Sequence, residues 1–168
     1  MTQNQKYTII QLFEDIDEGY EYTSKNWPLH STVIDTFAIS WPIDTMVTKL
    51  TEILQNHATA SSEARGDEKF GENGQVPAVL LHRSESLVNL HFDLLSVLEE
   101  GGIILDKPQY ARDGFIPHAT IQSHARLNKG DKVQFTALSI IDMCPGGVPF
   151  KRKVLKTIAI GNQLESRT

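Results

Sequence analysis

Apolar residues recur along the chain with two different spacings, and these spacings predict its elements. In two segments they recur every three or four residues, as on the buried face of an amphipathic helix. The first segment begins at residues 41–42 and carries Met46, Val47, Leu50, Ile53 and Leu54. The second spans residues 86–100, is ended by Gly101-Gly102, and carries Leu87, Leu90, Leu94, Leu95 and Leu98. We therefore predict two helices, each with one face in the core.

Shorter runs of β-branched and apolar residues, bounded by turn residues, predict strands. These runs cover residues 7–13, 29–40, 68–71, 76–81, 115–122, 133–143 and 154–160. Asn73-Gly74 lies between the third and fourth runs and is typical of a tight hairpin turn. Residues 14–19 are acidic and read as a solvated turn, and residues 59–67 read as a polar linker.

The order of these elements favours an α+β fold with largely antiparallel sheets. Strands and helices do not alternate regularly, as they would in a parallel α/β fold. A chain of 168 residues fits one compact domain, or two small lobes that share a core. Each helix has a single apolar stripe, so each is expected to cover one face of a sheet.

Two of the predicted strands carry the same short motif of histidine, any residue, threonine and an aliphatic residue. It reads His30-Ser31-Thr32-Val33 in one strand and His118-Ala119-Thr120-Ile121 in the other, each with a proline just upstream. Side chains alternate between the faces of a strand, so the histidine and threonine of each motif share a face, about 6.6 Å apart. The two strands can therefore offer two imidazoles and two hydroxyls to one site.

Context separates these two histidines from the others. His57 and His82 are also followed two residues later by a hydroxyl, but His57 ends a helical pattern and His82 runs into a helix start. Only His30 and His118 lie inside an extended run with an aliphatic residue directly after the threonine. One such histidine would be interpreted as a hydrogen-bonded structural residue, whereas two in matched context favour a shared function. His91 lies on the apolar stripe of the second helix and is predicted to be a packed structural histidine.

Alternation assigns the other residues of the motif strands to the helix side. Ser31 and Val33, like Ala119 and Ile121, are expected to face the helices and leave the motif side chains on an open face. Ile34 falls on that open face and is an exception to the alternation.

Charge and composition narrow the possible partners. The formal net charge is −5, and the one run of basic residues, Lys151-Arg152-Lys153, reads as the solvated start of a strand. A protein that grips a long nucleic-acid backbone usually presents a basic face, so we expect one or two phosphates held locally.

No apolar run approaches the ~20 residues that span a bilayer, so no membrane partner is expected. Cys144 has no internal disulfide partner and no export signal is present, which favours a cytoplasmic setting.

The paired motifs, and the helices and hairpin between them, resemble the 2H phosphoesterase superfamily. This superfamily includes the LigT-like 2′-5′ RNA ligases and the 2′,3′-cyclic phosphodiesterases. The matching segments are the two motifs and Lys69-Phe70-Gly71, within a resemblance that covers roughly residues 7–161. It implies one bilobal domain over residues 1–168, with pseudo-symmetric lobes, helices on the outer faces, and both motifs on the floor of a central groove. It also implies no metal and no other cofactor, and as partner an RNA end or a small cyclic nucleotide. No obligate protein partner is evident.

The resemblance implies a cyclic phosphodiesterase, with possible RNA ligase activity, and assigns the motif residues their roles. Opening a 2′,3′-cyclic phosphate needs a base for water and an acid for the departing ribose oxygen. Imidazole, with a reference pKa of about 6.5, can serve as either. His30 and His118 are predicted as this pair, with neither role assigned, and Thr32 and Thr120 as donors to the non-bridging oxygens. The same residues can act in reverse, so hydrolase and ligase are not separated.

Residues around the second motif are further candidates for substrate binding. Tyr110 and Arg112 precede it and are candidates for base stacking and phosphate contact. Gln122 and His124 continue the alternation of His118, and His124 is expected at the far end of the groove. Many LigT-like members continue this motif with an arginine soon after the threonine, whereas here Gln122-Ser123-His124 intervenes before Arg126. Which cation contacts the phosphate, and whether the substrate is RNA, stay open.

Three alternatives belong to other functional classes. A nucleotide-binding or RNA-end-binding module would keep the groove without turnover. A metal hydrolase would need closely spaced histidine ligands, and no His-x-x-x-His or His-x-His arrangement occurs. A serine hydrolase would need a Gly-x-Ser-x-Gly turn, which the sequence lacks.

Overall fold

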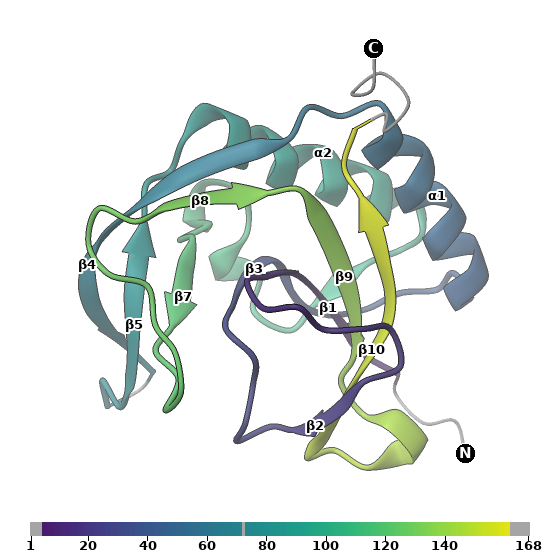
Figure 1. Cartoon of the computed structure of the whole chain (residues 1–168). Coiled ribbons are helices and arrows are strands. Elements are labelled where there is room, and N and C mark those ends of the chain that lie inside the picture. The colour runs from purple at the N-terminus through teal and green to yellow at the C-terminus, as the bar shows by residue number, and fades with distance from the viewer. Residues whose placement is uncertain (1–4, 72, 162–168) are drawn as a thin grey trace.

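The strands form two antiparallel sheets (Figure 1) in the computed structural model, which describes residues 5–71 and 73–161. The larger sheet has six strands in the order β2-β10-β9-β1-β3-β6, and the smaller has four in the order β7-β5-β4-β8. The strands are β1 (Tyr7–Leu12), β2 (Glu21–Thr23), β3 (His30–Ala38), β4 (Ala60–Phe70), β5 (Val76–Leu81), β6 (Ile104–Leu105), β7 (His118–Thr120), β8 (Lys132–Phe135), β9 (Ala137–Asp142) and β10 (Lys151–Ala159). Three short 3₁₀ helices are η1 (Pro108–Tyr110), η2 (Arg112–Gly114) and η3 (Pro145–Gly147). The predicted α+β class with antiparallel sheets is confirmed.

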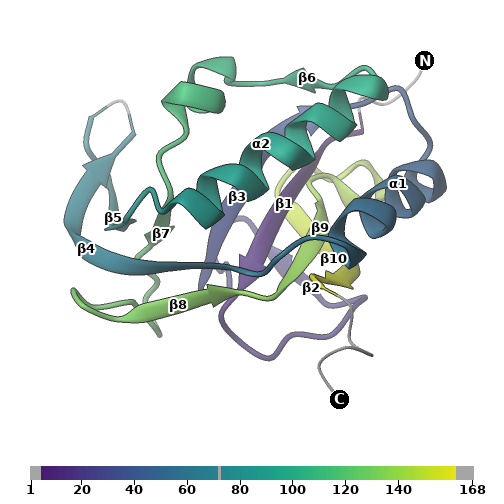
Figure 2. The ribbon, with the colours of Figure 1, turned by 90° about the horizontal axis from the view of Figure 1, so that it is seen from above.

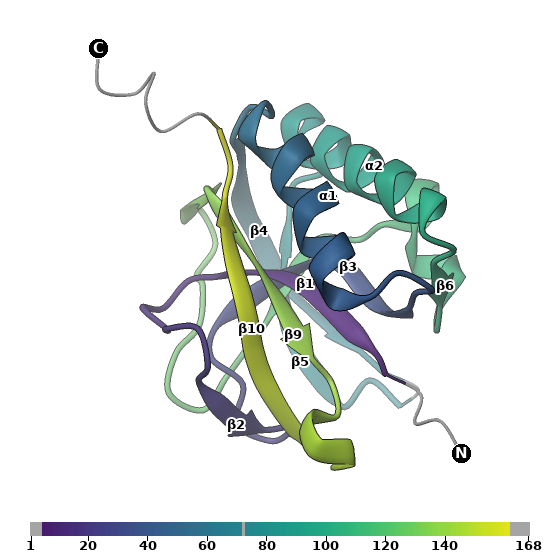
Figure 3. The same ribbon diagram turned by 90° about the vertical axis from the view of Figure 1, so that its right-hand side faces the viewer.

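Two α-helices, α1 (Ile43–Gln55) and α2 (Glu85–Glu100), lie side by side (Figure 3) and cover the core. Their fully buried leucines and methionine belong to the two predicted stripes. The Ser84 hydroxyl accepts the N–H of Leu87 and caps α2. Seen from above (Figure 2), α2 passes over the region where the two sheets approach, and it contacts β3 of one sheet and β4 of the other. One hydrophobic core therefore includes residues of both sheets and both helices. None of the helices in the described ranges is long and apolar enough to cross a membrane.

The prediction of a polar linker over residues 59–67 is wrong, because this segment forms most of β4. Its inward positions hold the small residues Ala60, Ser62 and Ala64, which alternate with exposed neighbours. The alternation is that of a half-buried strand. Two alanines and a serine are too small, however, to give a hydrophobic signal in the sequence. The predicted hairpin around Asn73-Gly74 is confirmed, because β4 pairs with β5 in antiparallel register.

The single strand predicted over residues 133–143 is also wrong, because the chain passes from one sheet to the other within it. β8 belongs to the four-stranded sheet and β9 to the six-stranded sheet, with Thr136 between them. The N–H groups of Thr136 and Ala137 both donate to Gln11 Oε1, at 2.8 and 3.1 Å. An uninterrupted run of β-forming residues cannot reveal this change of partner, which depends on where β4 and β1 lie.

Candidate active site

The first motif lies at a β-bulge in β3. One step along β1 spans two residues of β3, from Thr32 to Ile34, so Val33 is an extra residue in this strand. Val33 and Ile34 therefore both enter the core, and the next polar residue, Asp35, lines the same cavity as Thr32. The bulge explains why Ile34 breaks the simple alternation expected from the sequence.

His30 begins β3 and is held in a defined orientation. Its Nδ1 lies 2.8 Å from the carbonyl oxygen of Pro28, and the Trp27 ring stacks on the imidazole with centroids 4.5 Å apart. A carbonyl oxygen only accepts hydrogen bonds, so Nδ1 carries the proton of the neutral ring. The lone pair is then on Nε2, which has no hydrogen-bond partner among the described residues.

His30 is neutral over the physiological range. Burial lowers its pKa to about 4, and the nearby charge of His118 acts in the same direction. The hydrogen bond to the Pro28 carbonyl and the carboxylate of Glu14 oppose this shift without overcoming it. The Nε2 lone pair is therefore available to accept a proton at neutral pH.

His118 has the same local construction on the other sheet. It begins β7, and its Nδ1 lies 2.7 Å from the carbonyl oxygen of Ile116, again two residues upstream. The Phe70 ring stacks on the imidazole, with centroids 4.4 Å apart and an interplanar angle of 21°. The same argument places a proton on Nδ1, so Nε2 is the nitrogen that can exchange a proton with a ligand.

A direct hydrogen bond connects the two motif strands, although they belong to different sheets. The hydroxyl of Ser31 donates to the carbonyl oxygen of His118 at 2.8 Å, and Ser31 is only 1% exposed. The two imidazoles also lie close enough for the charge of His118 to act on His30. The structure thus brings together the two motifs that the sequence separates by almost ninety residues.

A cavity of about 470 Å³ opens beside the motifs. Thr32 and His118 line it, together with Asp35, Phe70, Lys107 and Tyr110. His30 and Thr120 are not among the lining residues. His30 lies two residues before Thr32 on β3, and Thr120 lies two residues after His118 on β7. The cavity is therefore large enough for a small organic ligand whose polar end reaches the motif side chains.

His91 links both motif segments from the buried side. It is 2% exposed, which confirms the prediction of a packed histidine. Its Nδ1 donates to the Val33 carbonyl at 2.7 Å, and its Nε2 accepts the N–H of Arg112 at 2.9 Å. The ring also stacks on Phe115, just upstream of the second motif, with centroids 4.1 Å apart. His91 therefore gives a partner to the carbonyl of the bulge residue and joins it to the loop before β7.

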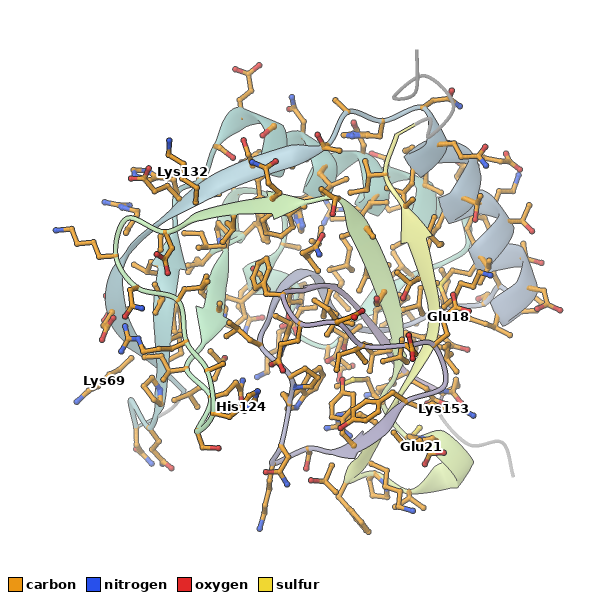
Figure 4. The ribbon with its side chains drawn as sticks, in the orientation of Figure 1. Glu18, Glu21, Lys69, His124, Lys132 and Lys153 are labelled. Atoms are coloured by element: carbon orange, nitrogen blue, oxygen red, sulfur yellow. The ribbon has the colours of Figure 1, made fainter. Side chains whose placement is uncertain are left out.

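Glu14 and His124 connect the two sheets by their loops. His124 Nε2 lies 2.7 Å from Glu14 Oε2, and Figure 4 shows His124 in the space between the sheets. The same carboxylate accepts the N–H of Leu29, next to His30. Burial raises the pKa of Glu14, but the Leu29 N–H and His124 together hold it below its usual value. Glu14 is thus half-buried within the acidic turn that was expected to be solvated.

The two arginines predicted near the substrate form ion pairs elsewhere. The guanidinium of Arg112 pairs with Glu99 on α2, and that of Arg126 lies 2.5 Å from Asp67 on β4. Neither lines the cavity. Arg112 also has φ of 59°, a left-handed conformation that is uncommon for a residue with a side chain.

The other two candidates take different positions. Tyr110 lines the cavity and is 43% exposed. Gln122 is half-buried, and its Nε2 donates to the Thr120 carbonyl at 3.4 Å.

Within residues 5–71 and 73–161, no three histidine, cysteine, aspartate or glutamate side chains gather as a metal site.

Sequence reasoning missed the residues that surround the motifs in space. Asp35 and Lys107 line the cavity, and Trp27 and Phe70 cover the two imidazoles. Trp27 has a signal in the sequence, because an aromatic residue three positions before His30 lies within its reach, and Phe70 belongs to the segment Lys69-Phe70-Gly71 that carries the family resemblance. The others depend on the bulge and on contacts between distant segments.

Comparison with known proteins identifies the family. The family model of the 2′-5′ RNA ligase superfamily matches residues 6–137. None of the curated proteins compared with the chain matches it. A solved structure described as a phosphoesterase superposes with a TM-score of 0.59 at 13% identity, covering 95% of this chain and 99% of its own. The protein TT0787 of Thermus thermophilus gives 0.60 at 14% identity, covering 92% and 97%. E. coli LigT in complex with 3′-AMP gives 0.57 at 13% identity, covering 95% and 99%.

These structural similarities, at such low identity, show a shared fold, and the family model covers most of the chain. The chain belongs to the 2′-5′ RNA ligase superfamily, the LigT-like group of 2H phosphoesterases.

Proposed function

We propose that this protein opens 2′,3′-cyclic phosphate ends of RNA or of small nucleotides, with His30 and His118 as base and acid. The observation that carries the proposal is the matched anchoring of the two imidazoles. Each ring donates from Nδ1 to the carbonyl two residues upstream, and each is stacked on an aromatic ring. Two such rings on adjoining strands suit a reaction that moves one proton on each side of a phosphorus atom.

In the hydrolytic direction, His30 is the base. Its pKa of about 4 keeps Nε2 unprotonated at neutral pH, so Nε2 can take a proton from water as the water oxygen bonds to phosphorus. The bond from phosphorus to one ribose oxygen breaks, and protonated His118 gives its Nε2 proton to that oxygen. One proton is taken up and one released, so the pair returns to its starting charge after proton exchange.

The threonines stabilise the charge that develops on phosphorus. Thr32 and Thr120 each lie two residues after a motif histidine, and both are half-buried. Their hydroxyls can donate to the non-bridging oxygens without titrating. In reverse, the same groups would join a hydroxyl to the cyclic phosphate, so the proposal covers both hydrolysis and ligation.

A nucleotide is the ligand class that the comparisons support. E. coli LigT, which shares the fold, forms complexes with 3′-AMP and with NADP+. The cavity beside Thr32 and His118 has the volume of a small-molecule site. The net charge of −5 favours a ligand with few phosphates over a long duplex.

The test is turnover of nucleoside 2′,3′-cyclic phosphates by the wild type and by single variants. His30→Gln and His118→Gln are each expected to lower kcat by about 10² to 10⁴, the usual contribution of general acid–base catalysis. His57→Gln is a matched control, because His57 has a threonine two residues later but pairs with Asp93 on α2. It should keep wild-type activity. Binding of the cyclic phosphates without turnover would indicate a non-catalytic nucleotide-binding module instead.

A further inference from the structure

The cavity beside the motifs contains two opposite charges, and no other side chain within residues 5–71 and 73–161 neutralises them. Asp35 and Lys107 both line it. Neither forms an ion pair within the part of the chain that the structure describes, and Asp35 has one hydrogen bond there, from the N–H of Thr36 at 2.9 Å. A carboxylate repels a phosphate, so Asp35 must face another part of the ligand.

The pairing of β3 with β6 places these two charges at the same end of the cavity. β6 runs antiparallel to β3, and just beyond it the N–H of Asp106 donates to the Thr36 carbonyl at 3.0 Å. Lys107 follows Asp106, and Asp35 precedes Thr36, so the antiparallel register brings Lys107 opposite Asp35. The cavity therefore presents an acceptor beside a donor.

Much of the remaining wall is formed by large apolar residues that are open to solvent. Val76, Tyr110 and Ile116 line the cavity with 40%, 43% and 41% of their surfaces exposed, although they are large hydrophobic residues. Phe70, already stacked on His118, contributes to the same wall. Exposed apolar and aromatic surface next to a few polar groups suits a flat heteroaromatic ring with hydrogen-bonding edges.

We infer that this cavity is a nucleobase site that selects guanine, with Asp35 and Lys107 as the specificity-determining residues. The Watson–Crick edge of guanine has two adjacent donors, N1–H and the 2-amino group, beside the O6 acceptor. The Asp35 carboxylate accepts from the two donors, and the Lys107 ammonium group donates to O6. Adenine, cytosine and uracil each lack the pair of adjacent donors. The inference rests on the proposed function, because it takes the ligand to be a nucleotide.

The test measures binding of nucleoside 3′-monophosphates to the full chain by calorimetry. Guanosine 3′-monophosphate is expected to bind about tenfold to a hundredfold more tightly than the adenosine, cytidine and uridine compounds, as for a bidentate contact with a base. Inosine 3′-monophosphate, which lacks the 2-amino group, should fall between them. All five ligands carry the same phosphate, so their affinity ratios report on the base alone.

Two variants assign the preference to the charged pair. Asp35→Asn keeps an oxygen for the Thr36 N–H and should reduce the ratio of guanosine to adenosine affinity to within about threefold of one. Lys107→Gln should reduce the same ratio, so it tests the inference even where Asp35→Asn folds poorly. Asp44→Asn removes a carboxylate from the exposed face of α1 and should leave the ratio unchanged.

The outcomes separate this inference from the proposed function. Equal affinities for all five ligands, absence of binding, or a guanosine preference that survives both variants would overturn the inference. Turnover of the cyclic phosphates is measured in parallel. Guanine-selective binding without turnover would support the inference and reject the phosphodiesterase. Turnover combined with equal affinity for every base would support the phosphodiesterase and reject the guanine site.

Discussion

Lowering the pH is expected to destabilise the fold through His30. The imidazole has a pKa of about 4 in the folded chain, against 6.5 for an ordinary histidine. Between these values the unfolded chain binds more protons, so the free energy of unfolding falls as the pH falls. The contribution is complete above about pH 6.5 and is lost progressively down to about pH 4. Linkage with these two pKa values gives a loss of about 2.5 kcal/mol between pH 7.5 and pH 4.5.

The measured loss should be somewhat smaller. His30 is half-buried, and water at the open edge of the ring screens part of the effect, so we expect about 2 kcal/mol. The pKa values of Glu14 and His91 are also lowered in the fold, so these groups contribute to the pH dependence of stability as well. The effect of His30 must therefore be measured as a difference between variants.

The assay is urea unfolding at pH 4.5, 5.5, 6.5 and 7.5 for the wild type, His30→Gln and Thr32→Val. The free energy of unfolding of the wild type should fall by about 2 kcal/mol more than that of His30→Gln over this range. Thr32→Val alters the same strand without removing a titrating group, so its curve should stay parallel to that of the wild type. Parallel curves for the wild type and His30→Gln would refute the argument that burial keeps this ring neutral.

Three further predictions test the network around the motifs. His91→Leu should lower the free energy of unfolding by about 2 to 4 kcal/mol in urea, because it leaves the buried Val33 carbonyl and the Arg112 N–H without their partners. Ser31→Ala should cost about 1 kcal/mol and also reduce kcat, because it frees the carbonyl of His118. Ser62→Ala, which removes a similar bond on β4, should cost stability alone. Glu14→Gln should move the acid limb of the kcat/KM profile below its wild-type position near pH 4, because the Glu14 carboxylate raises the pKa of His30. An unmoved limb would exclude this electrostatic effect.

Much of the fold could be predicted from local patterns. The helical stripes of α1 and α2 and the hairpin between β4 and β5 follow from short-range periodicity and turn chemistry. The prediction failed for β4, because the buried positions of that strand are occupied by small residues. It also failed at Thr136, because a run of β-forming residues does not record a change of sheet.

The candidate site shows the same division. Its two histidines could be chosen because each motif is contiguous and its context repeats. Asp35 could not be chosen, because the bulge at Val33 changes which residues share a face with Thr32. Arg112 and Arg126 were plausible phosphate contacts by position, yet their ion pairs with Glu99 and Asp67 depend on how α2 and β4 pack.

The amino-acid sequence by itself determined the helices, the hairpin and the two motif strands, because backbone periodicity and turn formation act over a few neighbouring residues. Only the tertiary structure decided that Ser31 bonds to the His118 carbonyl, that His91 bonds to the bulge, and that Asp35 and Lys107 line one cavity beside the motifs. These arrangements involve residues tens of positions apart, so they exist only once both sheets pack against α2 and bring distant polar groups together.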